Sequence, residues 1–141
     1  MSFDNFKLLS ISFATNKDFD KGKDVEINTE ISSAYKFIKE KKCLSIKIRI
    51  TLNQGNSPFY FDIESEGVFT FHTNPSKRII ENVTLINGPA IIFPYIRETI
   101  ADLTRRAGFP PLHIQPVNFV ELARQHKSTE VATQKKKTLK S

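Results

Sequence analysis

Residues 44–52 carry the most restrictive pattern in this chain, a strict alternation of apolar and polar side chains. Leu or Ile occupies every even position, and Ser, Lys, Arg or Thr occupies every odd position. Because successive side chains of a strand point to opposite faces, this period of two predicts a β-strand with one buried and one solvated face. Such a strand is typical of an antiparallel sheet that is covered on one side only.

Three further segments of the first half show the same period. We predict strands over about residues 6–14, over residues 25–37 and over a segment that starts at Phe59, after the turn signal of residues 53–58. Residues 39–42 are expected to turn the second strand into the third. The apolar positions that define the second strand are Val25, Ile27, Ile31, Tyr35 and Phe37.

The second half changes to helical spacing. The apolar stripe of Ile92, Ile96, Ile100 and Leu103 predicts an amphipathic helix that runs to about residue 107, where Gly108 ends it.

Two shorter helical segments flank this long helix. One, of about residues 76–87, is expected to break at Gly88–Pro89, and the other covers about residues 117–126. The predicted fold is therefore α+β: a four-stranded antiparallel sheet followed by a long helix, with a preceding helical segment, and a short C-terminal helix.

The net charge of +6 is unevenly distributed over the 141 residues. Residues 127–141 contain five Lys and one Glu, so they hold +4 of this charge and residues 1–126 hold +2. We predict a folded domain over residues 1–126 and a basic, disordered tail over residues 127–141. The small charge of the folded part argues against a nucleic-acid surface, which stays a distant alternative.

The sequence offers no recognisable catalytic chemistry. Its three His are widely separated, Cys43 is the single Cys, and no metal-ligand or nucleophile motif occurs. We therefore predict a protein that is not an enzyme and that uses neither metal nor cofactor. No signal peptide is recognisable, and the most apolar run, residues 90–93, is too short to cross a membrane, so we expect a cytoplasmic protein without membrane insertion.

What remains is a protein whose function lies in its surfaces. The chain has 12 Phe and no Trp, and the predicted sheet has exposed edges. The long helix carries more apolar surface than one small sheet face can cover. Both features favour an oligomer, and exposed apolar surface on a soluble protein is typical of polypeptide binding.

Three phrases in the second half indicate a family. They are IFPYIRE at residues 92–98, RAGFP at residues 106–110 and PVNF at residues 116–119. In order and spacing they resemble the C-terminal half of the bacterial export chaperone SecB. The strand count of the N-terminal half and the triplet of residues 67–69 agree, so the resemblance covers about residues 6–126.

This resemblance implies a cytosolic, ATP-independent holdase that forms homotetramers, as dimers of dimers, and binds unfolded precursors. It implies a client-binding groove that includes Val25, Ile27, Phe69, Phe119 and Leu122. It implies a surface for the translocase motor SecA at Tyr60 and Asp62. It implies an oligomer interface on the long helix at Ile92, Ile96, Ile100 and Leu103.

The charge of the chain departs from the family pattern. Typical members are acidic and end in an acidic tail, whereas this chain ends in KKKTLKS. Two functions therefore stay open: a holdase with broad export clients, and a SecB-like chaperone dedicated to one antitoxin of a toxin–antitoxin system. A basic nucleic-acid-binding module is the third alternative.

Overall fold

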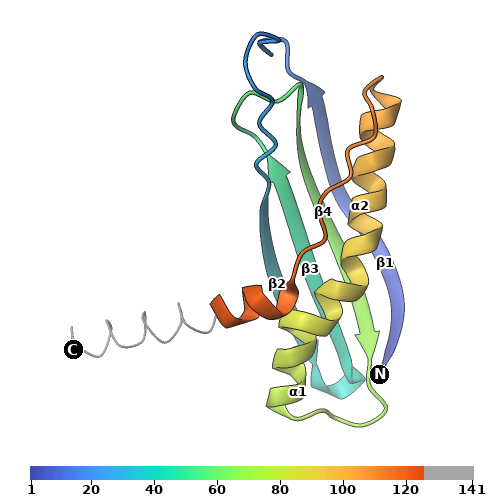
Figure 1. Cartoon of the computed structure of the whole chain (residues 1–141). Coiled ribbons are helices and arrows are strands. Elements are labelled where there is room, and N and C mark those ends of the chain that lie inside the picture. Colours follow the sequence, from blue (N-terminus) through green and yellow to red (C-terminus); the bar gives the residue numbers. More distant parts are fainter. Residues whose placement is uncertain (126–141) are drawn as a thin grey trace, which may run out of the picture.

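A four-stranded antiparallel sheet covered on one face by a long helix forms the body of the protein (Figure 1). The computed structural model describes residues 1–125, so the predicted tail of residues 127–141 and the domain boundary at residue 126 lie outside the described part. The spatial strand order is β1-β4-β3-β2. The strands are β1 (Ser2–Thr15), β2 (Glu30–Ile38), β3 (Cys43–Leu52) and β4 (Phe59–Thr70). The predicted α+β class is confirmed.

The central strands β3 and β4 bury one face and expose the other. The even positions of β3 are buried, and β4 alternates between buried and half-buried side chains along its whole length. The inward side chains are almost all aliphatic or aromatic, and together with the helix they form a single apolar core. Burial of this face is the main stabilising contribution to the domain.

The second strand is shorter than predicted. β2 begins at Glu30, so Val25 and Ile27 lie in the connection from β1, before the strand. The side chain of Asn56 holds this connection: its amide donates to the carbonyls of Asp20 (2.9 Å) and Asp24 (3.1 Å). These two carbonyls are therefore bonded to a side chain rather than to a neighbouring strand. The alternation of apolar side chains at Val25 and Ile27 does not make this connection a strand.

The helices also differ from the predicted break at Gly88–Pro89. Helix α1 (Lys77–Asn82), the π-helical segment η2 (Val83–Asn87) and helix α2 (Gly88–Arg106) follow one another without a gap. Pro89 has no N–H to donate to the carbonyl four residues earlier, and the N–H of Gly88 bonds instead to the carbonyl of Val83, five residues earlier. The proline thus widens the helix locally instead of ending it.

The continuous helix has 30 residues, and its most apolar 18-residue window has a mean hydropathy of 1.3. By length and composition this helix could cross a membrane. The apolar run of residues 90–93, on which the expectation of no membrane insertion rested, is by itself too short to do so. Core helices of globular domains meet the same criterion. Here Ile92, Ile96 and Ile100 are fully buried and belong to the core cluster shared with β3 and β4, so one face of the helix packs on the sheet.

Two glycines set how closely this helix approaches the sheet. A Cβ on Gly67 of β4 would lie 2.4 Å from Cδ1 of Ile92, and a Cβ on Gly88 would lie 2.3 Å from Cδ1 of Ile46. Both distances are far shorter than a van der Waals contact between carbon atoms. The absence of a side chain at these two positions therefore allows the isoleucines of the opposite layer to fill the space.

Candidate functional site

The chain turns back after α2 and runs as an extended segment, residues 109–118, into a short helix that includes residues 119–125 (Figure 1). This confirms the predicted last helix, which begins two residues later than expected. Asn118 caps it: its Oδ1 accepts from the N–H of Glu121 at 3.1 Å. The ring of Phe119 meets that of Phe93 on α2 edge-on, with centroids 5.6 Å apart. The helix is thereby fixed over the sheet at the end of α2 that adjoins η2.

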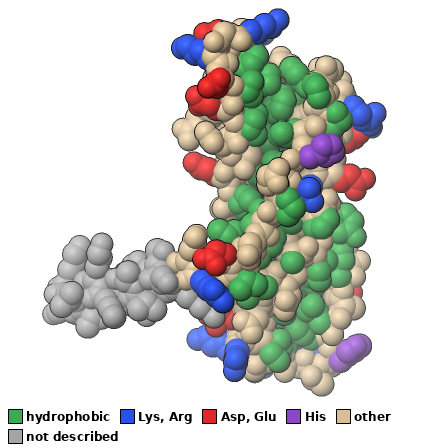
Figure 2. All heavy atoms as spheres, in the orientation of Figure 1, with side chains coloured by type: hydrophobic (Ala, Val, Ile, Leu, Met, Phe, Trp, Pro, Cys, Tyr) green, Lys and Arg blue, Asp and Glu red, His purple; other side chains and the backbone are tan. Residues whose placement is uncertain are grey.

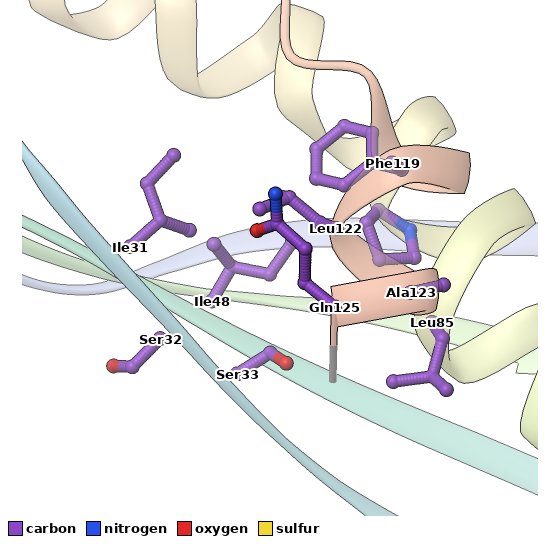
Figure 3. Close-up of a pocket in the computed structure, with 10 residues that line it drawn as sticks. Ile31, Ser32, Ser33, Ile48, Leu85, Phe119, Leu122, Ala123 and Gln125 are labelled. Atoms are coloured by element: carbon purple, nitrogen blue, oxygen red, sulfur yellow. The ribbon is translucent and has the colours of Figure 1, made fainter. Parts of the chain in front are cut away.

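A hollow of about 360 Å³, hollow one, lies between this short helix and the sheet (Figure 3). Strand β2 supplies one side, β3 the base and the helix η2–α2 the far side, so segments distant in sequence meet there. Its lining is mainly apolar, with two serines and one glutamine as its polar members. The residues are Ile31, Ser32, Ser33, Ile48, Leu85, Pro89, Phe119, Leu122, Ala123 and Gln125.

A second hollow of about 410 Å³, hollow two, lies beside the first. Ile31 lines both hollows, and the two are together called the groove. The wall across from β2 and the connection before it is the extended stretch of residues 112–117, the far wall, with Leu112, Ile114 and Val117 on its apolar side. Figure 2 shows that hydrophobic side chains gather on this face of the molecule.

Helix α2 holds the far wall through two hydrogen bonds. The N–H of Leu112 donates to Oγ1 of Thr104 at 2.9 Å, and Nε of Arg97 donates to the carbonyl of Ile114 at 2.7 Å. Thr104 is fully buried, and its hydroxyl donates in turn to the carbonyl of Ile100 at 2.9 Å. Within the described residues, the wall is an irregular segment attached to a rigid element.

The predicted groove residues divide into two groups. Ile27 lines hollow two, and Phe119 and Leu122 line hollow one. Val25 is 56% exposed and lines neither hollow. Phe69 is fully buried beneath the helix, with its ring 5.2 Å from that of Phe3, so it belongs to the core rather than to the groove.

Several groove residues were missed from the sequence. The far wall contains alternating apolar side chains, Leu112 and Ile114, which are a sign of an extended segment with one covered face. The surrounding prolines had suggested a plain loop. Ile31 was assigned only to a strand core, and its place at the sheet edge depends on a strand order that the sequence pattern does not contain.

The groove is suited to apolar contact rather than to chemistry. Among the described residues there is no group of three or more His, Cys, Asp or Glu that could hold a metal ion. Among the residues that the structure describes, the one titratable residue that lines either hollow is His113. What the arrangement can do is bury apolar side chains of a ligand beside a sheet edge.

The two residues predicted to face a translocase lie on the opposite, outer face of the sheet. The hydroxyl of Tyr60 donates to the carbonyl of Gly55 at 2.8 Å and accepts from Nδ2 of Asn16 at 3.1 Å. The carboxylate of Asp62 accepts from Nε of Arg49 at 2.9 Å and forms an ion pair with the same guanidinium. This hydrogen bond, together with the positive charge of Arg49, holds the pKa of Asp62 below its usual range.

Two other acidic residues of the outer face lie opposite basic residues in the sheet register. Glu66 is paired in register with Lys47 on one side and Lys7 on the other, and Glu64 is paired with Arg49. Opposite charges on directly facing positions of a sheet attract one another. The outer face therefore presents acidic groups that each have a basic neighbour within the chain.

The predicted oligomer interface needs correction at three of its four residues. Ile92, Ile96 and Ile100 are fully buried against the sheet of their own chain, so these side chains are not available to another protomer. Leu103 is half-buried against the same core, and its place in an interface stays a prediction.

The exposed apolar surface lies elsewhere. Its members on the helix are Ile79, Ile91 and Tyr95, and those on the edge strand β1 are Leu8, Leu9 and Ile11.

Comparison with known proteins gives consistent matches. The family model described as preprotein translocase subunit SecB matches residues 4–130. The protein-export protein SecB of Paramagnetospirillum magneticum is 38% identical over 101 residues, which is 72% of this chain and 60% of that protein. The corresponding protein of Azorhizobium caulinodans is 40% identical over 77 residues, 55% of this chain and 48% of that protein. The chain spans between 39% and 68% of the length of the relatives compared.

A solved structure has the same fold. It is the SecB-like chaperone of Mycobacterium tuberculosis in complex with a ChAD peptide from the HigA1 antitoxin. The TM-score is 0.70 at 22% identity, and the match covers 82% of this chain and 90% of that one.

Proposed function

This chain belongs to the SecB family, and we propose that it is an ATP-independent holdase chaperone that binds non-native polypeptides in the groove and keeps them soluble for delivery. The observation that carries the proposal is the groove itself, formed by hollows one and two, with its mainly apolar lining. The family is one of translocase subunits rather than enzymes, in agreement with the sequence-based prediction.

The physics of the groove suits a binder of many sequences. Apolar contact contributes about 25 cal/mol per Å² of buried surface and does not depend on a particular side chain. Strand β2 is the outermost strand on this side of the sheet, so an extended client has an unpaired strand edge available for backbone hydrogen bonds. Side-chain burial and strand addition together favour extended, unfolded segments over folded proteins.

A second candidate function is that of a chaperone dedicated to one antitoxin. Two observations favour it: the solved structure of the same fold carries an antitoxin peptide, and Asp62 on the outer face of this chain is already in an ion pair with Arg49. Under this alternative the groove would serve one client segment, and the contact with SecA at Tyr60 and Asp62 would be absent.

We also propose self-association as a homotetramer in the cytoplasm. The surfaces that support it are the exposed apolar side chains of α2, with Ile91 and Tyr95, and the edge strand β1 with Leu8 and Ile11. Exposed apolar side chains of this kind on an edge strand and on a packed helix favour contact with another copy.

The groove is tested by a pair of matched substitutions on the short helix. Leu122→Glu places a charge in hollow one, whereas Val120→Glu places it on a similarly exposed position that lines neither hollow (42% and 46% exposed). The unaltered protein and Val120→Glu are expected to suppress aggregation of a chemically denatured client at a twofold tetramer excess without ATP. Leu122→Glu is expected to lose most of this activity while keeping its unfolding midpoint.

The result that contradicts the proposal is full aggregation in the presence of the unaltered protein. Equal activity of the two variants would place client binding outside hollow one. The two functions separate by what co-purifies from the source cells. Many unrelated precursors support the export holdase, and one small DNA-binding antitoxin supports the dedicated chaperone.

A further inference from the structure

The far wall of the groove is held by side chains of α2. Strands β2 and β3 form the near side of hollow one, whereas the near side of hollow two is Ile31 in β2 together with residues 27 and 29 of the connection before it. Residues 112–117 belong to no helix or strand. Within the described part of the chain, this wall is joined to α2 by the bonds from Arg97 and to Thr104. An irregular segment with few backbone bonds moves more easily than a paired strand.

The two bonds have different roles. Thr104 is fully buried and also bonds within its own helix, so a change there disturbs the core. Arg97 is half-buried, and its bond to the carbonyl of Ile114 is charge-assisted, which makes it the stronger kind of contact for a backbone acceptor. Ile114 lines hollow two and packs against the core, so the bond to its carbonyl fixes the position of the backbone that forms this part of the wall.

We infer that Arg97 is a positioning residue that sets the width of hollow two and thereby selects the size of the apolar side chain that this hollow accepts. The inference rests on the proposed client-binding function. Arg97 acts through the backbone of Ile114 and does not line either hollow itself. With the wall fixed, hollow two discriminates among apolar side chains; with the wall released, it adapts to each of them and discriminates less.

A series of synthetic peptides tests this with the full chain. Each peptide has nine residues. One position is a fixed Leu, the position four residues later is Ala, Val, Leu or Phe, and all the others are Gly or Ser. In an extended peptide these two positions share a face and lie about 13 Å apart. Affinities are compared for the unaltered protein, Arg97→Gln, Arg97→Lys and the matched control Arg105→Gln, whose guanidinium pairs with Asp102 on the same helix.

The unaltered protein and Arg105→Gln are expected to show about a tenfold spread of affinity across the series. Arg97→Gln is expected to reduce the spread to less than about threefold and to speed hydrogen exchange of residues 112–117, with an unchanged unfolding midpoint. Arg97→Lys is expected to restore part of the spread, because an ammonium can still donate to the carbonyl.

A spread that Arg97→Gln leaves intact, or an equal weakening of every peptide, would overturn this inference and leave the proposed function standing. Failure of the unaltered protein to bind any peptide of the series would overturn both.

Discussion

The contact between Gly67 and Ile92 provides a quantitative test of how the long helix is placed on the sheet. An added Cβ at residue 67 would lie 2.4 Å from Cδ1 and 2.6 Å from Cγ1 of Ile92. Ordinary carbon contacts are about 3.5–4.0 Å, so Ile92 has to move by about 1 Å or more. Overpacking of this kind costs about 1–3 kcal/mol of the free energy of unfolding.

A double-mutant cycle separates this collision from other effects. Ile92→Ala alone removes buried methyl groups and is expected to cost about 2–5 kcal/mol. In the Gly67→Ala, Ile92→Ala double variant both colliding atoms are gone, and the new methyl group fills part of the space. The double variant should therefore be more stable than the sum of the single changes predicts, by about 1 kcal/mol or more.

The assay is urea unfolding at one fixed protomer concentration, because self-association makes apparent stability depend on concentration. Gly22→Ala serves as the matched control. A Cβ there would meet only Oδ1 of Asp20, at 3.3 Å, and this carboxylate can move. The change in the free energy of unfolding of Gly22→Ala measures the backbone effect of replacing Gly by Ala. If Gly67→Ala is no less stable than Gly22→Ala, or if the single changes simply add, the packing argument is refuted.

Two further predictions concern the surfaces. Arg49→Gln is expected to raise the pKa of Asp62 toward its ordinary value, as measured by NMR titration of its carboxyl carbon. The stabilisation that the ion pair gives the folded state is present above the unfolded pKa and is lost as pH falls through the lowered folded pKa. An unchanged titration midpoint of Asp62 would contradict the assigned cause. Ile91→Glu is expected to yield smaller assemblies in size-exclusion chromatography with light scattering, because it charges the exposed face of α2. Glu98→Gln on the same helix should leave the assembly unchanged, and intact assemblies of Ile91→Glu would exclude this face as an interface.

The sequence predicted the strands of the sheet well because the alternation of apolar and polar residues within one strand shows directly which of its side chains are buried. The period of residues 44–52 directly reports which side chains are buried, and the structure confirms it at every position. Helix α2 was equally clear in its periodicity. The periodicity did not show what covers the apolar face of this helix. Ile92, Ile96 and Ile100 pack on the sheet of their own chain, whereas the resemblance to a family had suggested contact with another protomer.

The groove was harder to predict because it depends on long-range placement. Val25 and Ile31 share one parity in sequence, yet the ladder with β3 starts only at Glu30, and Val25 is left exposed. The far wall is irregular, so no period identified it. Phe119 and Leu122 were found through the resemblance, since an apolar helix face alone does not distinguish a groove wall from a core.

The buried face of the long helix follows an unusually regular step of four residues. Thr84, Gly88, Ile92, Ile96, Ile100 and Thr104 form this row and are all buried. A row of this spacing makes a ridge inclined to the helix axis. One residue inserted within the row would turn everything beyond it by about 100°. Thr104 would then lose its bond from the N–H of Leu112, so the number of residues between the sheet contacts and Thr104 determines whether this residue can hold the far wall.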